Sequence, residues 1–306
     1  MSLPTTSTTV GYPAGDVAGK SPVLAVPVLP DGRWAVVVAD TPFHPLDHTW
    51  PDQPADTGTL TVAGRTHPVV DCQTAGVGPD GEFAVAGDIP VRRGDESWAW
   101  LVLHVVDPAD GVEPASLVGA EAVLAVDPER RAALSAAHTA CHLMAFALNE
   151  ALAERWRKEV RTDALGRPDF DNLAMDTSRI GEWTSRDDYR IGKSLRKKGF
   201  GSEGLADDLA AVQERANATL AGWVASGAAV RIEVPDTALT ARRVWHCALP
   251  DGDAHIPCGG SHAHSLANLA SVVVGLDLSA DGTELTARTT VTPAPASGGP
   301  ARISTT

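Results

Sequence analysis

The sequence predicts an α+β fold, with β-structure in the first 125 residues and mixed helices and strands after them. Residues 1–125 contain short apolar stretches separated by turn signals at intervals of about 8 to 12 residues, which is typical of a small barrel or sandwich. From Asp127-Pro128 onward, apolar residues instead recur with the period of a helix. We therefore expect one domain at 1–125 and a second at 126–292.

The strands expected in the first domain flank tight turns. Pro30-Asp31-Gly32 and Ala63-Gly64 are turn sequences, because glycine and aspartate tolerate the backbone conformations of such turns. Apolar stretches around these turns, and others like them, are expected to form strands at 22–29, 33–40, 57–62, 65–70, 82–86, 96–106 and 121–125.

A long helix is expected to begin the second domain. Asp127 suits the N-cap, since its carboxylate can accept hydrogen bonds from free N–H groups, and Pro128 at the first helical position has no N–H to leave unpaired. The predicted helix runs to about Trp156. Its apolar stripe, at alternating steps of four and three residues, comprises Leu134, His138, Cys141, Ala145, Leu148 and Leu152.

The rest of the chain is less regular. Residues 161–203 break the helical pattern and are expected to form a basic insertion in the second domain. Further elements are predicted as a helix at 205–225 and strands at 229–234, 244–248, 271–278 and 284–291. The Pro/Ala/Ser/Gly-rich segment 293–306 is expected to be a disordered tail.

Composition excludes several classes of protein. The chain has 306 residues, of which 43% are hydrophobic and 21% charged, an ordinary water-soluble composition with room for two domains. No segment reaches the roughly 18 consecutive apolar residues of a membrane span, and residues 1–20 lack a signal-peptide pattern. Four cysteines make no disulfide framework. We therefore expect a cytoplasmic protein without a membrane partner, either a monomer or a homodimer.

The net charge also limits the partners. With 25 basic and 39 acidic residues, the formal charge is −14. This charge argues against a protein that coats DNA or other nucleic acid without specificity, although it leaves room for a local basic surface.

Two short motifs predict a metal site. His138 and His142 are four residues apart on the predicted helix, a spacing that places both imidazoles on one face. Cys258-Gly259-Gly260-Ser261-His262 supplies a thiolate and a third imidazole, and its glycines allow the loop to bring both side chains together. Three nitrogen ligands and one sulfur ligand suit tetrahedral Zn²⁺. The alternative for His138 alone is a buried core histidine.

At these motifs the sequence resembles the editing domain of alanyl-tRNA synthetases and its free-standing relatives, the AlaX proteins. Their pattern is His-x-x-x-His followed at long distance by Cys-x-x-x-His, matched here by His138, His142, Cys258 and His262. A further family segment, Phe-x-Pro followed by Gly-Gly-Gln and Asp-x-Gly-x-Leu, is matched by 43–45 and 53–60. Pro51-Asp52 replaces the Gly-Gly of that segment, whereas Gln53 is retained.

The resemblance implies a zinc-dependent hydrolase that deacylates misacylated tRNA in trans. It implies an N-terminal β-barrel joined to a two-layer α/β editing core, the type of domain found as the second additional domain of threonyl- and alanyl-tRNA synthetases. The implied substrates are seryl- or glycyl-tRNA(Ala), or a threonine analogue such as fluorothreonyl-tRNA, which a divergent branch removes. The alternatives are a zinc hydrolase of a small ester or amide, and a non-catalytic zinc-containing binding protein.

Polar residues near the predicted metal ligands are candidates for contacting the substrate. Thr139 and Gln53 are expected to contact the amino-acid side chain or to position water, with a hydrogen bond to a carbonyl of its own helix as the alternative for Thr139. Asp52 and Asp56 are candidates for catalytic groups or loop caps, and the cap is favoured for Asp56. His262 is the predicted ligand most able to exchange for water or substrate.

A basic segment is the predicted tRNA-binding surface. Residues 179–198 hold seven basic and three acidic residues, and aromatic residues interleave with them. The alternative is an ordinary solvated surface. Phosphate contacts are expected from Arg190, Lys193, Arg196, Lys197 and Lys198.

Overall fold

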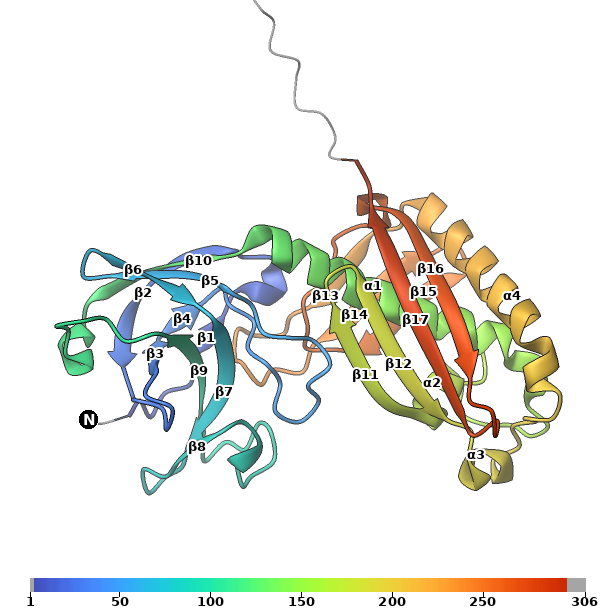
Figure 1. Ribbon diagram of the computed structural model, residues 1–306, viewed down its shortest axis with the longest axis horizontal. Coiled ribbons are helices and arrows are strands. Elements are labelled where there is room, and N and C mark those ends of the chain that lie inside the picture. Colours follow the sequence, from blue (N-terminus) through green and yellow to red (C-terminus); the bar gives the residue numbers. More distant parts are fainter. Residues whose placement is uncertain (1–2, 296–306) are drawn as a thin grey trace, which may run out of the picture.

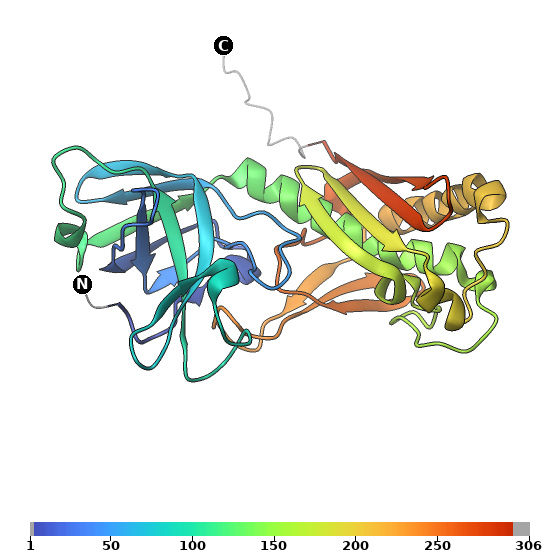
Figure 2. The ribbon, with the colours of Figure 1, turned by 60° about the horizontal axis from the view of Figure 1, so that its bottom comes forward.

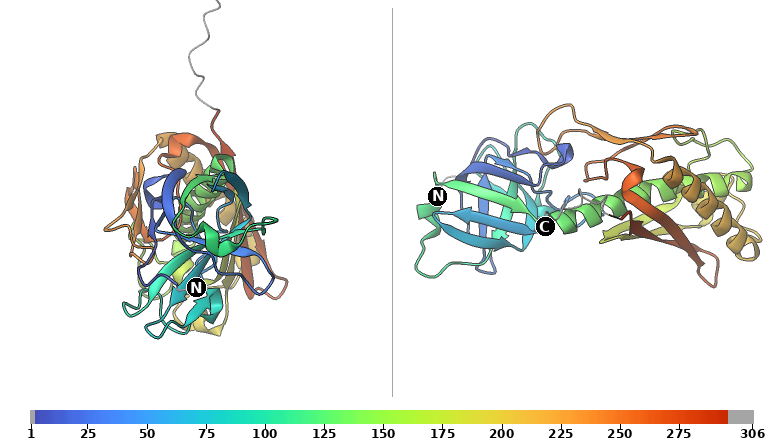
Figure 3. Two further views of the ribbon diagram at one scale, coloured as in Figure 1. Left: turned by 90° about the vertical axis from the view of Figure 1, so that its left-hand side faces the viewer. Right: turned by 90° about the horizontal axis from the view of Figure 1, so that it is seen from above.

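The computed structural model describes residues 3–295, which form two halves joined by one long helix (Figure 1). Helix α1 (Pro128–Ala151) begins at the N-terminal half and runs into the C-terminal half, as the view from above also shows (Figure 3). The fold is α+β, as predicted. Within the described residues, no helix is both long and apolar enough to span a membrane.

The N-terminal half is a curled antiparallel sheet with the shape of a half-barrel (Figure 1). Its strand order is β6-β5-β10-β2-β3-β9-β7-β8. The strands are β2 (Ala18–Ala25), β3 (Trp34–Val38), β5 (Gly58–Val62), β6 (Arg65–Val69), β7 (Asp71–Val77), β8 (Phe83–Val85), β9 (Ala99–Val106) and β10 (Glu121–Val126). Two short strands, β1 (Thr9–Val10) and β4 (Asp40–Thr41), pair in parallel beside this sheet.

The hairpin β5–β6 has the predicted turn. Ala63 and Gly64 both have positive φ, 49° and 75°, the conformation that two-residue hairpin turns require. Strand β2 begins at Ala18, earlier than predicted, because its first residues pair with β10. Single 3-10 turns lie at Tyr12–Ala14, Ala86–Asp88, Pro114–Leu117, Ala153–Arg155 and Leu266–Asn268.

The C-terminal half places α1 between two antiparallel sheets (Figure 2). A four-stranded sheet has the order β11-β12-β17-β16 and packs against α1 and α4. A three-stranded sheet, β13-β14-β15, packs on the other side of α1 through Trp245. The elements are α2 (Phe170–Ala174), β11 (Met175–Gly181), β12 (Thr184–Arg190), α3 (Lys193–Lys197), α4 (Leu205–Ser226), β13 (Val230–Glu233), β14 (Val244–Leu249), β15 (Gly252–Pro257), β16 (Leu269–Leu278) and β17 (Glu284–Pro293).

Helix α1 begins where the sequence predicts and ends earlier. The Asp127 carboxylate accepts hydrogen bonds from the backbone N–H groups of Glu129 and Arg130. The expected end near Trp156 is wrong: the helix ends at Ala151, and Trp156 forms an isolated β-bridge with Phe200. The expected single stripe is also too narrow, because a helix between two sheets is buried on most of its circumference.

Residues 161–203, expected as an insertion, instead supply half of the four-stranded sheet. β12 pairs with β17 over seven residues, so this segment is integral to the sheet. Its inward-facing residues include Ser178, Ser185 and Asp187, which form a buried polar network and hide the apolar alternation that predicts a strand. The tail expected at 293–306 lies outside the described residues from residue 296 onward, and Pro293 ends β17.

The buried Asp187 makes stability depend on pH. Burial raises the pKa of this carboxyl to about 6, above its value in an unfolded chain, although hydrogen bonds from Ser178, Cys141 and Ser185 oppose the rise. The folded state therefore binds more protons than the unfolded state between pH 4 and 6.

We expect the free energy of unfolding to fall by on the order of 3 kcal/mol as pH rises through this window. Asp187→Asn should flatten that dependence in urea unfolding measured from pH 4 to 7. Asp171, whose pKa burial raises to about 7, extends the slope toward neutral pH, so the comparison includes Asp171→Asn. A slope in Asp187→Asn as steep as in the unmodified chain would contradict the assignment.

Candidate metal centre

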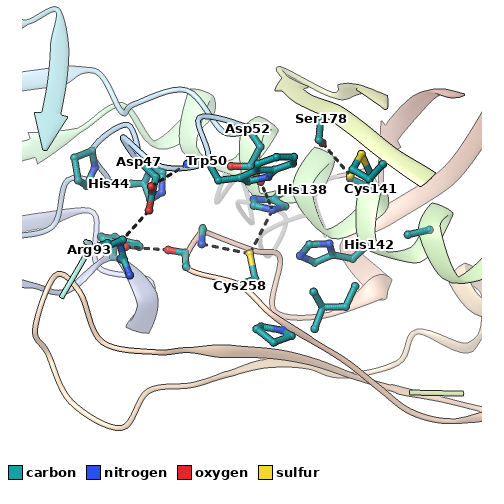
Figure 4. A pocket seen from close by; sticks show the side chains of 18 of the residues that line it. His44, Asp47, Trp50, Asp52, Arg93, His138, Cys141, His142, Ser178 and Cys258 are labelled. Carbon is teal, nitrogen blue, oxygen red and sulfur yellow. Dashed lines mark hydrogen bonds and ion pairs between the residues drawn. The ribbon is translucent and has the colours of Figure 1, made fainter. Parts of the chain in front are cut away.

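The two predicted motifs meet at one place, between the half-barrel and the C-terminal half. His138 and His142 lie one turn apart on α1, and Cys258 and His262 come from the loop after β15. One ligand atom from each residue lies within 4.8 Å of the ligand atoms of the others. Figure 4 shows His138, His142 and Cys258 pointing toward one another. This group could hold a metal ion such as zinc.

The ligand atoms are directed at a common point. The Cys258 Sγ atom lies 3.4 Å from His138 Nε2 and 3.3 Å from His262 Nε2. The His142 Nε2 atom is buried and has no hydrogen-bond partner in the described residues. A buried, unpaired ring nitrogen is costly without a partner, and a metal ion at this point would supply one.

Gln53, from the half-barrel side, orients His138. The Gln53 Oε1 atom accepts a hydrogen bond from the Ser261 backbone N–H at 3.0 Å and lies 2.8 Å from His138 Nδ1. Because Gln53 Oε1 can only accept, Nδ1 carries the proton and Nε2 keeps its lone pair for a metal. The Gln53 side chain is buried behind the imidazole, and its expected contact with substrate or water stays a prediction.

Thr139 plays the equivalent part for His262. Its Oγ1 atom accepts a hydrogen bond from the Ala263 backbone N–H at 3.0 Å and lies 3.3 Å from His262 Nδ1. With Nε2 of His262 facing Cys258, Nδ1 donates to this hydroxyl. Thr139 is fully buried, and its expected contact with substrate or water stays a prediction.

The ligand loop is tied to both halves of the molecule. Tyr12 of the N-terminal half donates a hydrogen bond to the Gly259 carbonyl at 2.9 Å. Arg243, before β14, donates to the Tyr12 hydroxyl at 3.3 Å, and its carbonyl accepts from the Cys258 N–H at 3.1 Å. These contacts fix the loop before any ion binds.

Gly260 has no room for a side chain. A Cβ atom at this position would lie 2.5 Å from His138 Nδ1 and 2.7 Å from Gln53 Oε1. We expect Gly260→Ala to displace the imidazole and to weaken zinc binding by about tenfold or more, measured by competition with a chelator. Gly259→Ala is the matched control, because a Cβ there meets only Arg93 Nη2, at 3.9 Å. Equal zinc affinity in the two variants would contradict this packing.

Burial sets the charge state of the ligands without metal. It lowers the pKa values of His142 and His262 well below the usual range, so both imidazoles are neutral at pH 7. It raises the pKa of the Cys258 thiol to about 12. A bound cation would reverse this rise and stabilise the thiolate, so metal binding here is expected to release a proton.

Three of the four candidate ligands, His138, His142 and Cys258, line a pocket of about 540 Å³ between the two halves (Figure 4), whereas His262 lines a second pocket. His44, Trp50 and Asp52 line the first pocket from the half-barrel side, and Asp171 and Ser178 line it from the C-terminal half. Asp171 and Ser178 lie in no recognisable motif, so the sequence alone does not point to them. A pocket that encloses candidate ligands is the expected place for a substrate.

Asp56, by contrast, is structural. Its carboxylate is fully buried, accepts from the His44 backbone N–H at 2.5 Å and pairs with Arg131 of α1. The favoured prediction of a loop cap is therefore confirmed, and the pair also binds the loop to the helix.

The predicted tRNA-binding residues lie on the surface, away from the metal group. Arg190 ends β12 and pairs with Asp176 at 2.9 Å. Lys193, Arg196, Lys197 and Lys198 belong to α3 or its C-cap, at the end of the C-terminal half that is farther from the half-barrel (Figure 1).

Comparison with known proteins adds no assignment. No model of a known protein family matches the sequence, and a search of curated proteins finds no match.

Proposed function

We propose that this protein is a zinc-dependent hydrolase that removes a wrong amino acid from tRNA in trans, by cleaving the ester at the tRNA 3′ end. The observation that carries the proposal is the convergence of His138, His142, Cys258 and His262 beside an open pocket. The resemblance of these motifs to those of the AlaX family supports the choice of an aminoacyl ester as the substrate.

The donor set fits zinc. Three neutral imidazoles and one thiolate, formed from Cys258 on binding, are ligands that zinc prefers, and an ion would supply the partner that His142 Nε2 lacks in the described residues. When bound, zinc would polarise a carbonyl or lower the pKa of a bound water. Either role would need a coordination position open to the pocket that His138, His142 and Cys258 line, and the exchange of His262 expected from the sequence stays a prediction.

Side chains around the metal group hold the ligand rings in place. Gln53 and Thr139 hold two ligand rings through their Nδ1 atoms. Because the ester is already activated, orientation of water and substrate supplies much of the catalysis. The half-barrel and the C-terminal half both contribute lining residues, so the ester would be enclosed between them.

A panel of charged tRNAs tests the proposal. Seryl-, glycyl-, threonyl- and fluorothreonyl-tRNA are incubated with the zinc-loaded protein and with Cys258→Ala, and the remaining ester is measured over time. We expect at least one of these aminoacyl esters to be hydrolysed by the unmodified protein and to persist with the variant. If every aminoacyl ester survives with both proteins, the proposed deacylase activity is excluded.

A small ester or amide is the second candidate substrate. Pro51-Asp52 favours it, because this stiff, acidic pair stands in the pocket loop where the resembled motif has Gly-Gly. Under this candidate, free amino-acid methyl esters would be hydrolysed as fast as the tRNA-bound esters. A non-catalytic zinc module would instead hydrolyse neither and would unfold on chelation.

A further inference from the structure

Asp52 is a carboxylate held rigidly beside the metal group. Its backbone carbonyl accepts from the Ile180 N–H of β11 at 2.8 Å, and its own N–H donates to the Trp50 carbonyl at 2.9 Å. The Asp52 Oδ1 atom accepts from the Gln53 N–H at 2.7 Å. Pro51 restricts the backbone further. One carboxylate oxygen is thus fixed by the loop, and the other remains available.

The available oxygen faces the metal group. The Asp52 Oδ2 atom lies 3.5 Å from His138 Nε2, the nitrogen that Gln53 leaves unprotonated. Figure 4 shows Asp52 next to His138 at the pocket. The side chain is 19% exposed, so it is shielded from bulk water but open to a pocket occupant.

No lysine or arginine of the described residues pairs with this carboxylate. Among residues 3–295, no lysine or arginine nitrogen lies within 4.0 Å of the Asp52 carboxylate, whereas Asp47, in the same pocket, pairs with Arg93 at 3.0 Å. A shielded carboxylate without a partner is costly, and either the zinc ion or a cationic group of a pocket occupant would complement it. Because Asp52 also lines the pocket, the occupant is the complement that we favour.

We propose that Asp52 binds the protonated α-amine of the substrate. The proposal rests on the proposed function: in an aminoacyl ester, the α-carbon that bears the ammonium group is bonded to the carbonyl that is cleaved. With that carbonyl at the metal group, the ammonium group lies within reach of Asp52 Oδ2. The pocket therefore takes aminoacyl esters with a free α-amine and excludes N-blocked esters, such as those of peptidyl- or formylaminoacyl-tRNA.

Binding of non-hydrolysable probes tests this assignment separately from catalysis. Serinamide carries a protonated α-amine, and N-acetylserinamide is neutral at the same position. Affinities of both for the zinc-loaded protein and for Asp52→Asn are measured by isothermal titration calorimetry. We expect the unmodified protein to prefer serinamide by about tenfold or more, and Asp52→Asn to lose this preference. Asp171→Asn, which changes another carboxylate of the pocket, is expected to keep it.

A measurement of zinc affinity separates this role from metal ligation. If Asp52 bound the metal, Asp52→Asn would weaken zinc binding and would lower both probe affinities equally, which would overturn the proposal. Retained discrimination in Asp52→Asn, or no binding of serinamide by the unmodified protein, would overturn it too. Discrimination between the probes without hydrolysis of any charged tRNA would support the ammonium site while rejecting the proposed function.

Discussion

Replacing Cys258 by alanine is expected to remove the metal and the activity together. The variant loses the sulfur ligand that lies 3.4 Å from His138 Nε2 and 3.3 Å from His262 Nε2. Because loss of a residue that merely orients a ligand already costs 10- to 100-fold in affinity, we expect zinc affinity to fall by about 100-fold or more. Deacylation should fall at least as far. Elemental analysis after dialysis and single-turnover deacylation measure the two effects.

Two controls make this result specific. Cys72→Ala changes a buried cysteine of the half-barrel and should retain zinc and activity. A second group, His246, Asp253 and His255, lies at the surface of the three-stranded sheet and could also hold a metal ion. The zinc measurement therefore includes His255→Ala. If His255→Ala lost the tightly bound zinc and Cys258→Ala retained it, the zinc would bind at the second group. That result would contradict the proposed metal centre.

Among the substitutions proposed for this protein, Asp56→Ala is expected to lower the free energy of unfolding the most. Asp56 is fully buried and Arg131 is 6% exposed, so removing the carboxylate leaves the guanidinium without its buried anionic partner. It also leaves the His44 backbone N–H without its acceptor. We expect the free energy of unfolding to fall by about 3–5 kcal/mol, measured by urea denaturation.

A double-mutant cycle checks that the loss comes from the pair. Arg131→Met should cost a similar amount, and the double variant should cost less than the two single changes combined, because it buries no unpaired charge. Strictly additive losses would show that the two side chains stabilise the fold independently.

The ligand set could be predicted from the sequence because its geometry is mostly local. Spacing of four residues on a helix brings His138 and His142 together whatever the rest of the chain does. The spacing of Cys258 and His262 similarly confines both to one loop. The sequence does not determine which nitrogen of each imidazole ring faces the metal group. The contacts of Gln53 and Thr139 with the Nδ1 atoms of His138 and His262 therefore become visible only in the structure, and their contacts with substrate stay a prediction.

The fold was predictable where apolar residues alternate. Strands β3, β5 and β10 follow their predicted positions closely, because their inward residues are apolar. Strands β11 and β12 escape prediction because Ser178, Ser185 and Asp187 face inward. Such a polar network is stable only once its partners have assembled, which no local window of sequence can report.

The loop that carries the thiol is anchored by residues more than two hundred positions earlier in the chain, Tyr12 and Gln53. Zinc binding at this loop and packing of the N-terminal half against the C-terminal half are therefore coupled equilibria. A substitution that weakens the contacts between the two halves should therefore lower the affinity for zinc, even when the substituted residue contacts no ligand. Conversely, loading with zinc should strengthen those contacts by the same free energy, since the linkage is reciprocal.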